Sequence, residues 1–368
     1  MKKLFHKKKA IPYLLFSLIL ILSCCRKNLP VKPGNMESVS EYKATELVSP
    51  LANKVITCGD SVLIEVKLKG EVTHIDSIIV QEGRKGKTAF EGQNRVYWSS
   101  SDSRTGKNTL KINVYFNDSL HESHAVSLLV KSDIVPVNYN YKVISRFPHD
   151  RHAYTQGLIY YQGKLIESTG LEGQSSVRFV DISTGNVLKI VPLESQFFGE
   201  GIALYKDMIY QVTYRSKVGF IYNINTLELI RRFDYQIREG WGLTSDGTRL
   251  IMSDGSSLLY FIEPELFTQT DQIEVYDNVT QYDSLNELEY INGKILANVY
   301  GQTYILIIDP ATGKVTGKIE LRNLMPEGSI GDYGKVLNGI AYNPQTLHLY
   351  VTGKNWPVLY EIALEPSL

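Results

Sequence analysis

Short apolar segments, bounded by glycine, asparagine, aspartate or serine, follow one another from about residue 49 to the C-terminus. Many of them alternate apolar and polar positions, and they are rich in β-branched and aromatic residues. Such segments predict strands, and no long stretch has the 3.6-residue period of an amphipathic helix. The hydrophobic pattern therefore predicts an all-β protein.

From residue 139 onward the pattern repeats every 40 to 50 residues, roughly, and each repeat contains four predicted strands. This repeat is typical of a β-propeller, so five repeats predict five blades. The fifth repeat lacks a fourth strand, and the segment 142–147 resembles one. We expect this N-terminal strand to complete the last blade and close the ring. The five repeats open on the phrases Gln156-Gly157-Leu158, Glu200-Gly201-Ile202, Trp241-Gly242-Leu243, Asn286-Glu287-Leu288 and Asn338-Gly339-Ile340.

The first position of each phrase varies, and it opens the strand that lines the channel of a propeller. An antiparallel hairpin places this residue near the one that ends the second strand. Ten positions are therefore expected at one mouth of the channel. The inner ring is Gln156, Glu200, Trp241, Asn286 and Asn338, and the flanking set is Gly170, Tyr214, Gly255, Tyr300 and Lys354.

One acid, one base, amides and aromatic rings at one mouth predict a small polar pocket with aromatic walls. Polar residues at a channel mouth can instead be merely solvated, and for Asn286 or Asn338 alone this is the favoured interpretation. Glu200 differs, because Phe197 and Phe198 precede it and aromatic residues share its ring. Burial among aromatic rings raises the pKa of a carboxyl toward neutrality, which suits acid–base catalysis.

The first half of the chain contains no comparable group of candidate catalytic residues. Residues 46–136 contain short alternating strands separated by polar turns, which predict a small β-sandwich of the immunoglobulin type. We interpret it as a spacer or docking module. The propeller is assigned to residues 137–368.

Residues 1–24 have the features of a lipoprotein-type signal peptide: a lysine-rich start, a short apolar run and a cysteine at the cleavage point. Cys24 would then carry the lipid, and the polar linker 25–45 would tether the protein to the cell envelope, on the periplasmic or the outer face. An ordinary secretory signal is the alternative. Cys58 is then the one cysteine of the folded part, so we expect a structural thiol and no intramolecular disulfide.

The charge balance is even, with 39 basic and 39 acidic residues. No basic stripe indicates a nucleic-acid partner, and the only membrane contact expected is the lipid anchor. The seven histidines show no metal-ligand spacing, and His149 and His152 are interpreted as part of an exposed turn. We therefore expect no metal, no cofactor and a monomer.

The repeated phrases and their surroundings resemble the plant-type glutaminyl-peptide cyclotransferases, over roughly residues 142 to 364. The family is a five-bladed propeller, in agreement with the repeat count. The matching pieces include Phe147-Pro148-His149-Asp150, Tyr154-Thr155-Gln156-Gly157-Leu158, Glu167-Ser168-Thr169-Gly170-Leu171, Phe198-Gly199-Glu200-Gly201, Gly240-Trp241-Gly242-Leu243, Leu285-Asn286-Glu287-Leu288 and Gly353-Lys354-Asn355-Trp356-Pro357.

The resemblance implies cyclisation of an N-terminal glutaminyl residue of a peptide or protein to pyroglutamate, with release of ammonia. It gives Glu200 the role of general acid and base. The indole N–H of Trp241, Asn286 and Lys354 are candidate donors to the oxyanion, and Gln156 is a candidate for holding the substrate's amine or backbone. Tyr154, Phe198, Tyr214 and Tyr300 complete the implied substrate-binding set.

The chain departs from the family pattern at three aromatic positions. Tyr214 and Tyr300 stand where the family has tryptophan, and Tyr154 stands where it has phenylalanine. These changes replace indole donors by hydroxyls and put efficiency and substrate preference in question. The alternative function is a non-catalytic propeller that binds peptides or a partner protein at the same mouth. A lyase of similar shape would need a metal or further histidines there.

Overall fold

The computed structural model describes residues 43–83, 86–118 and 120–366. The predicted signal peptide, the lipidation site Cys24 and nearly all of the linker lie outside these residues. The regular structure that is described consists of strands and one short 3-10 turn, η1 (Arg322–Leu324). The prediction of an all-β protein is therefore confirmed. No helix among the described residues has the length and apolar character that a membrane span requires.

The N-terminal part contains two sheets that share one hydrophobic core. Strand β3 (Ser61–Leu68) shows why: Val62, Ile64 and Val66 are buried in the core, whereas the residues between them are only partly buried. Cys58 is buried beside this core, and its thiol donates to the backbone carbonyls of a neighbouring loop, which fits a structural role. One sheet has the order β1 (Thr45–Ser49), β3 (Ser61–Leu68), β6 (Arg95–Ser99), and the other β2 (Lys54–Thr57), β8 (Leu120–Lys131), β7 (Gly106–Phe116), β4 (Ile75–Glu82), β5 (Lys87–Glu91).

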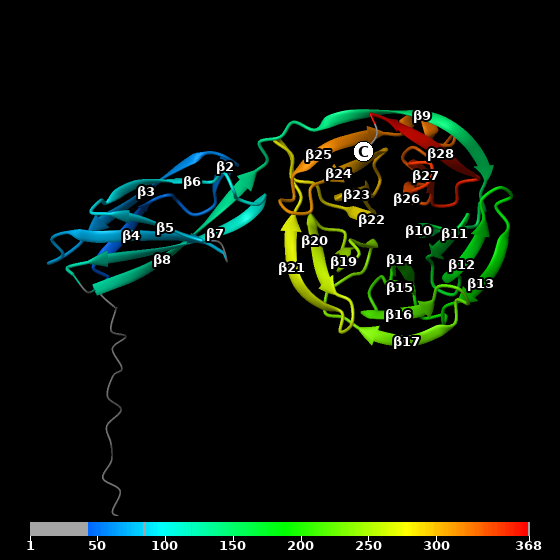
Figure 1. The fold of residues 1–368 in the computed structure, drawn as a ribbon, viewed down its shortest axis with the longest axis horizontal. Helices are drawn as coiled ribbons and strands as arrows, with labels where there is room; N and C mark the ends of the chain where they lie inside the picture. Colours follow the sequence, from blue (N-terminus) through cyan, green and yellow to red (C-terminus); the bar gives the residue numbers. More distant parts are fainter. Residues whose placement is uncertain (1–42, 84–85, 119, 367–368) are drawn as a thin grey trace, which may run out of the picture. The chain divides into compact units, whose positions relative to one another are not determined.

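The C-terminal part begins with three separate antiparallel sheets of four strands, each in sequence order. Figure 1 shows them around a common centre, with β10 and β14 innermost and β13, β17 and β21 outermost. They are β10 (Thr155–Tyr161), β11 (Lys164–Thr169), β12 (Ser176–Asp181) and β13 (Val187–Pro192); β14 (Gly199–Tyr205), β15 (Met208–Thr213), β16 (Val218–Asn223) and β17 (Leu229–Asp234); and β18 (Leu243–Ser245), β19 (Leu250–Ser253), β20 (Leu258–Glu263) and β21 (Thr268–Glu274).

An eight-stranded sheet completes the ring, in the order β22-β23-β24-β25-β9-β28-β27-β26. Its two halves meet at β9, which pairs with β28 over most of its length and with β25 at its start. The predicted pairing of segment 142–147 with the C-terminal strand is therefore confirmed. The strands are β22 (Leu285–Ile291), β23 (Lys294–Val299), β24 (Tyr304–Ile308), β25 (Val315–Glu320), β9 (Val137–Pro148), β28 (Val358–Glu365), β27 (His348–Gly353) and β26 (Leu337–Asn343).

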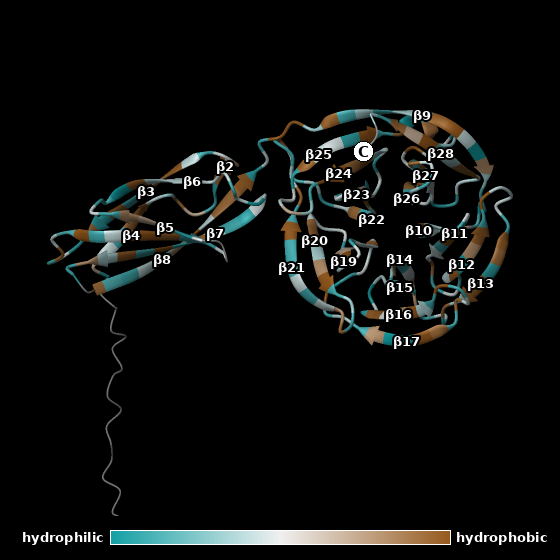
Figure 2. Ribbon diagram, in the orientation of Figure 1, coloured by the Kyte–Doolittle hydropathy of each residue, from teal (hydrophilic) through white to brown (hydrophobic). Residues whose placement is uncertain are grey.

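Apolar residues pack between neighbouring sheets of the ring, in five clusters of buried side chains. Strand β9 alternates half-buried and exposed residues along most of its length, and its colour changes repeatedly with the hydropathy of these residues (Figure 2). This pattern is expected where one face of a strand packs inward and the other meets solvent.

The innermost strands approach so closely that the repeated glycines are required. A Cβ at Gly201 or Gly242 would overlap the backbone of the next innermost strand, and one at Gly157 would crowd Ile202. The fourth phrase has Glu287 at this position. Its buried carboxyl accepts hydrogen bonds from the backbone N–H groups of Leu158 (3.3 Å) and Ile340 (2.9 Å), and so links β22 to β10 and β26.

Candidate functional site

A cavity of about 240 Å³ lies where the first strands of the ring begin. The structure brings together around it all nine residues that the sequence assigned to catalysis and substrate binding. Gly170 and Gly255, from the flanking set, give room to aromatic rings, because a Cβ on them would overlap Phe198 and Trp241. The lining residues are Tyr154, Gln156, Phe198, Glu200, Tyr214, Trp241, Asn286, Tyr300 and Lys354.

Backbone irregularities aim the inner-ring side chains at this cavity. In four of the five hairpins the strand register shifts at the variable residue of the phrase, as in a β-bulge. The shifts fall between Thr155 and Gly157, Gly199 and Ile202, Leu285 and Leu288, and Leu337 and Ile340. A regular strand would alternate these side chains between two faces, whereas a bulge adds a residue, bends the strand locally and re-aims a side chain.

Glu200 is the buried acid of the cavity, with 5% of its surface exposed. Its Oε1 accepts a hydrogen bond of 3.1 Å from the amide Nε2 of Gln156. Burial raises the pKa of Glu200 well above its usual value, against the opposing effect of the Lys354 ammonium, and the carboxylate of Glu239 raises the pKa further. The sequence-based expectation of a raised pKa at this position therefore agrees in direction with the structure.

Lys354 is the buried base, and it enters the cavity from the end of β27. Its ammonium lies 4.6 Å from the ring centre of Tyr154 and 5.1 Å from that of Tyr300, within the range of cation–π attraction. Burial lowers the pKa of Lys354 to about 8, and the nearby Glu200 opposes this shift. The amine thus loses its proton near physiological pH, whereas a lysine in water loses it more than two pH units higher.

Two of the buried amide side chains form a series of hydrogen bonds that ends at the acid. Asn338 donates from Nδ2 to the side-chain oxygen of Gln156 (3.2 Å) and to the backbone oxygen of Thr155 (2.9 Å). Gln156 is therefore oriented with its NH2 group toward Glu200. Asn286 is also buried, and its Oδ1 has no hydrogen-bond partner among the described residues. The interpretation of Asn286 and Asn338 as merely solvated residues is therefore wrong.

Aromatic side chains wall the cavity in an unbroken series of edge-on and tilted contacts. The hydroxyls of Tyr154 and Tyr300 also interact with each other. At position 300, where the family has tryptophan, this chain therefore places a hydroxyl in the wall instead of an indole N–H. The ring centres are separated by 6.1 Å for Tyr154–Phe198, 5.8 Å for Phe198–Tyr214, 6.2 Å for Tyr214–Trp241 and 5.8 Å for Trp241–Tyr300.

The structure corrects one assigned role. The indole N–H of Trp241 donates to the carboxylate of Glu239 (3.1 Å), so it is not free to stabilise an oxyanion. Glu239 was missed by the sequence reasoning, because it stands two residues before the variable position and belongs to no repeated phrase. The available signal was its place directly before the Gly240-Trp241-Gly242 motif.

A second correction concerns His149, which was expected in an exposed turn. Its side chain is buried, and its ring nitrogens contact the backbone oxygen of Trp356 (2.8 Å) and the carboxylate of Glu167 (3.1 Å). Arg178 pairs with the same carboxylate (2.8 Å). His152 is exposed as expected. The histidine of the Pro148-His149-Asp150 motif is thus part of a buried ionic cluster behind the site.

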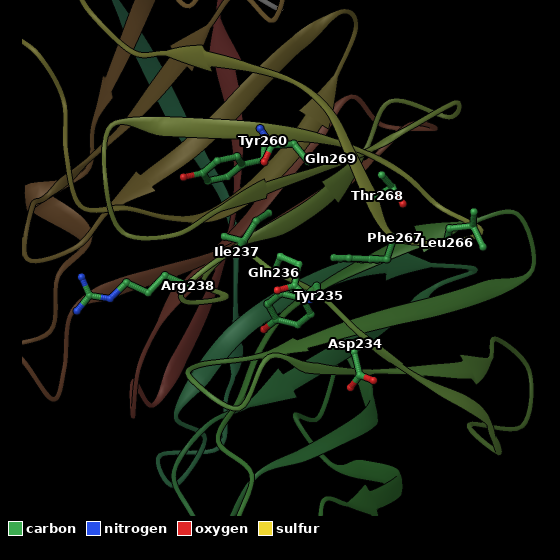
Figure 3. Close-up of a pocket in the computed structure, with 10 residues that line it drawn as sticks. All are labelled: Asp234, Tyr235, Gln236, Ile237, Arg238, Tyr260, Leu266, Phe267, Thr268 and Gln269. Carbon is green, nitrogen blue, oxygen red and sulfur yellow. The ribbon is translucent and has the colours of Figure 1, made fainter. Parts of the chain in front are cut away.

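A larger cavity of about 610 Å³ lies between the segments 234–238 and 266–269, with Tyr260 beside them. Figure 3 shows its ten lining side chains, among which the exposed Leu266 and the buried Phe267 are neighbours. Its lining includes one carboxylate, Asp234, and no buried acid–base pair. The smaller cavity is therefore the candidate site.

The smaller cavity joins a buried acid, a buried amine and oriented amides, so the fold and site define a ring-shaped all-β protein equipped for acid–base chemistry on a small polar group. The sequence model of the glutamine cyclotransferase family matches residues 119–364, a range that begins ahead of the resemblance described above. The chain belongs to the glutamine cyclotransferase family.

Two relatives agree with this assignment. The chain is 42% identical to glutaminyl-peptide cyclotransferase from Arabidopsis thaliana over 231 residues, which cover 61% of this chain and 72% of the relative. The crystal structure of the glutaminyl cyclase from Myxococcus xanthus is 33% identical and superposes with a TM-score of 0.58, covering 62% of this chain and 98% of that one.

Proposed function

We propose that the protein is a glutaminyl-peptide cyclotransferase, which converts N-terminal glutaminyl residues of peptides or proteins to pyroglutamate and releases ammonia. The observation that carries the proposal is the pairing of buried Glu200 with Gln156 in a cavity that Lys354 and Asn286 also line. Family membership supports the same reaction, because the Arabidopsis relative is a glutaminyl-peptide cyclotransferase.

In this reaction the substrate supplies its own nucleophile. The α-amine attacks the carbon of the γ-carboxamide, a C–N bond forms, and the carbonyl becomes a tetrahedral oxyanion. The bond to the amide nitrogen then breaks and ammonia leaves. The protein contributes mainly orientation, because the two reacting groups are already tethered in one residue. The aromatic walls and the amides of Gln156 and Asn286 define the space in which the side chain folds back.

Glu200 transfers the proton in this scheme. The amine must lose a proton and the departing nitrogen must gain one, and a single carboxyl can accept the first and deliver the second. Its raised pKa brings the neutral form closer in free energy to the ionised form than in an exposed glutamate. Gln156 donates to Oε1, which holds the carboxyl in place for both transfers.

Lys354 and Asn286 stabilise the oxyanion. The ammonium of Lys354 is buried and has no ion-pair partner within salt-bridge distance among the described residues, so its charge is available to the reacting oxygen. The amide of Asn286 offers two N–H donors, and its unpartnered Oδ1 is an acceptor for the substrate's amine or carboxamide. No step of this scheme requires a metal or a cofactor.

At the level of the fold, we propose that the five groups of four strands are the blades of a five-bladed β-propeller closed by β9. We propose that the two N-terminal sheets form an immunoglobulin-like domain that spaces the ring from its anchor. Supporting observations are the repeated four-strand order and the shared core of the N-terminal sheets.

The test uses the full-length protein and a peptide that begins with glutamine. We expect ammonia release and a pyroglutamyl product, and no product from the same peptide with an acetylated amine. Glu200→Gln should lower kcat by about 100-fold or more, because proton transfer by a positioned group contributes that much. A folded wild type without turnover would overturn the proposal. If that protein still bound the peptide, the alternative of a peptide-binding propeller would gain support.

We also propose a lipid-anchored monomer in the cell envelope, which rests on the lysine-rich start, the apolar run and Cys24. Metabolic labelling with a radioactive fatty acid should mark the wild type and leave Cys24→Ser unlabelled. Labelling of both proteins would contradict the assignment of Cys24.

A further inference from the structure

Glu239 lies in the segment between β17 and β18, directly before the Gly240-Trp241 pair. Each of its carboxylate oxygens has a different partner. Oε2 accepts the indole N–H of Trp241 at 3.1 Å, and Oε1 accepts the guanidinium Nε–H of Arg215 at 3.0 Å. The hydroxyl of Tyr214 also interacts with this carboxylate. Glu239 therefore touches two of the aromatic walls of the cavity without lining it.

These contacts complete the packing of the Trp241 indole. One side of the ring lies against Gly255, where a Cβ would overlap it, and its edges meet Tyr214 and Tyr300 in T-shaped arrangements. Packing of this kind fixes the position of the ring, and the hydrogen bond to Glu239 fixes which edge faces away from the cavity. The indole thus presents carbon rather than its N–H to the space where substrate would sit.

Arg215 holds the carboxylate from the other side. Its guanidinium lies 4.4 Å from the ring centre of Tyr214, so one side chain contacts both an acid and a wall residue. The Arg215 side chain is 67% exposed, and an ion pair with such a partner contributes little free energy by itself. The bond between Glu239 and the half-buried indole is therefore the contact whose loss should matter.

We propose that Glu239 is a positioning residue of the glutaminyl site, which clamps Trp241 and Tyr214 in the orientation that shapes the substrate-binding cavity. This inference rests on the proposed function. In this role Glu239 acts through Trp241 and Tyr214 and does not contact the substrate. Without the carboxylate, the indole N–H loses this partner, and a ring that lines the cavity loses one of the contacts that fix its orientation.

Kinetics of three variants of the full-length protein test the proposal. Glu239→Ala should raise KM for a glutaminyl peptide by about tenfold, with a smaller change in kcat, because one hydrogen bond to a charged group is lost. Glu239→Gln keeps an oxygen acceptor for the indole and should recover KM to within about threefold of the wild type. Glu228→Ala, an exposed turn residue, is the matched control and should behave as the wild type.

Two kinetic outcomes would overturn the clamp. An unchanged KM in Glu239→Ala is one. The other is an equal loss in Glu239→Gln and Glu239→Ala accompanied by a shifted pH profile, because the charge of Glu239 on Glu200 would then account for the effect. The titratable and charged groups that interact with Glu239 are Arg215, Tyr214, Arg238 and Glu200.

Acrylamide quenching of tryptophan fluorescence gives a readout that needs no turnover. Trp98 and Trp356 are buried, so quenching at low acrylamide reports on the half-buried Trp241. Glu239→Ala should increase this quenching and Glu239→Gln should not, with Trp241→Phe as the blank. If the wild type cyclises no peptide but the quenching changes as expected, the proposed function fails and the clamp stands. Unchanged quenching in Glu239→Ala overturns the clamp itself.

Discussion

At the scale of single residues, the site depends on burying an acid and an amine in one small cavity. Glu200 and Lys354 have pKa values shifted toward each other, upward for the acid and downward for the amine, and burial is the main cause in both cases. Groups with such shifts cluster at functional sites, because proton transfer near neutral pH needs them. The sequence contained enough to predict the acid, since aromatic residues precede it and share its ring.

The first prediction concerns the alkaline limb of the pH profile. The ammonium of Lys354 is the form that stabilises the oxyanion, and its pKa of about 8 means that this form is lost as pH rises through that value. We expect kcat to fall above pH about 8. Lys354→Arg should move the fall to higher pH, because a guanidinium keeps its proton there, even if the maximal rate drops. An identical alkaline limb in both proteins would show that another group sets it.

At the scale of elements, the hairpins explain why sequence reasoning placed the ten mouth positions. The second strand of each hairpin returns antiparallel to the first, with or without a bulge, and this alone brings the start of one strand near the end of the other. The register shifts at Gln156, Glu200, Asn286 and Asn338 could not be predicted, because these strands are buried at most positions and show no alternation that an extra residue would interrupt. Nor could it be predicted that Trp241 gives its N–H to Glu239, because a side chain's partner depends on a loop path that periodicity does not describe.

The buried cluster of His149, Glu167 and Arg178 joins three elements and yields the second prediction. Glu167 lies on β11, Arg178 on β12 and His149 directly after β9, and the pKa of Glu167 is held at about 2, with the charges of Arg178 and His149 outweighing burial. Glu167→Gln removes the carboxylate that His149 and Arg178 share, and leaves Arg178 paired with Asp150. We expect the free energy of unfolding to fall by about 3 to 5 kcal/mol.

Urea denaturation at pH 7 measures this change, with the exposed Glu172→Gln as control. The depressed pKa of Glu167 also fixes the sign of the pH dependence. Its stabilisation is complete above the ordinary glutamate pKa near 4.5 and is lost as pH falls toward about 2. The difference between wild type and variant should therefore shrink with acidification over that range. A constant difference would contradict the ion-pair explanation.

At the scale of the whole molecule, closure of the ring by β9 could be predicted from a missing fourth strand and a matching segment at the front. The extra pairing of β9 with β25 could not, because three residues of parallel pairing leave no pattern in the sequence. The strand makes the N-terminal boundary of the ring testable. A ring that folds by itself must start at Val137 rather than at residue 149, because β9 lies between β25 and β28 in the eight-stranded sheet.

Two truncations make the third prediction. A protein that starts at residue 137 keeps β9 and should fold and retain the proposed cyclase activity. A protein that starts at residue 149 exposes the edges of β25 and β28 and should aggregate or fail to unfold cooperatively. Circular dichroism and size-exclusion chromatography distinguish these outcomes. Equal folding of both truncations would contradict the closing role of β9.

The same strand has a consequence for biosynthesis. Its last residue, Pro148, precedes the end of its partner β28, Glu365, by 217 positions, since 365 − 148 = 217. At about 5 to 20 residues per second, a ribosome needs roughly 10 to 40 s to deliver that partner. During this interval β9 is an unpaired edge that could join the wrong chain. In β9, apolar residues alternate with Asn138, Asn140, Lys142 and Arg146. Polar and charged residues of this kind disfavour pairing with a strand of another chain before β28 has been synthesised.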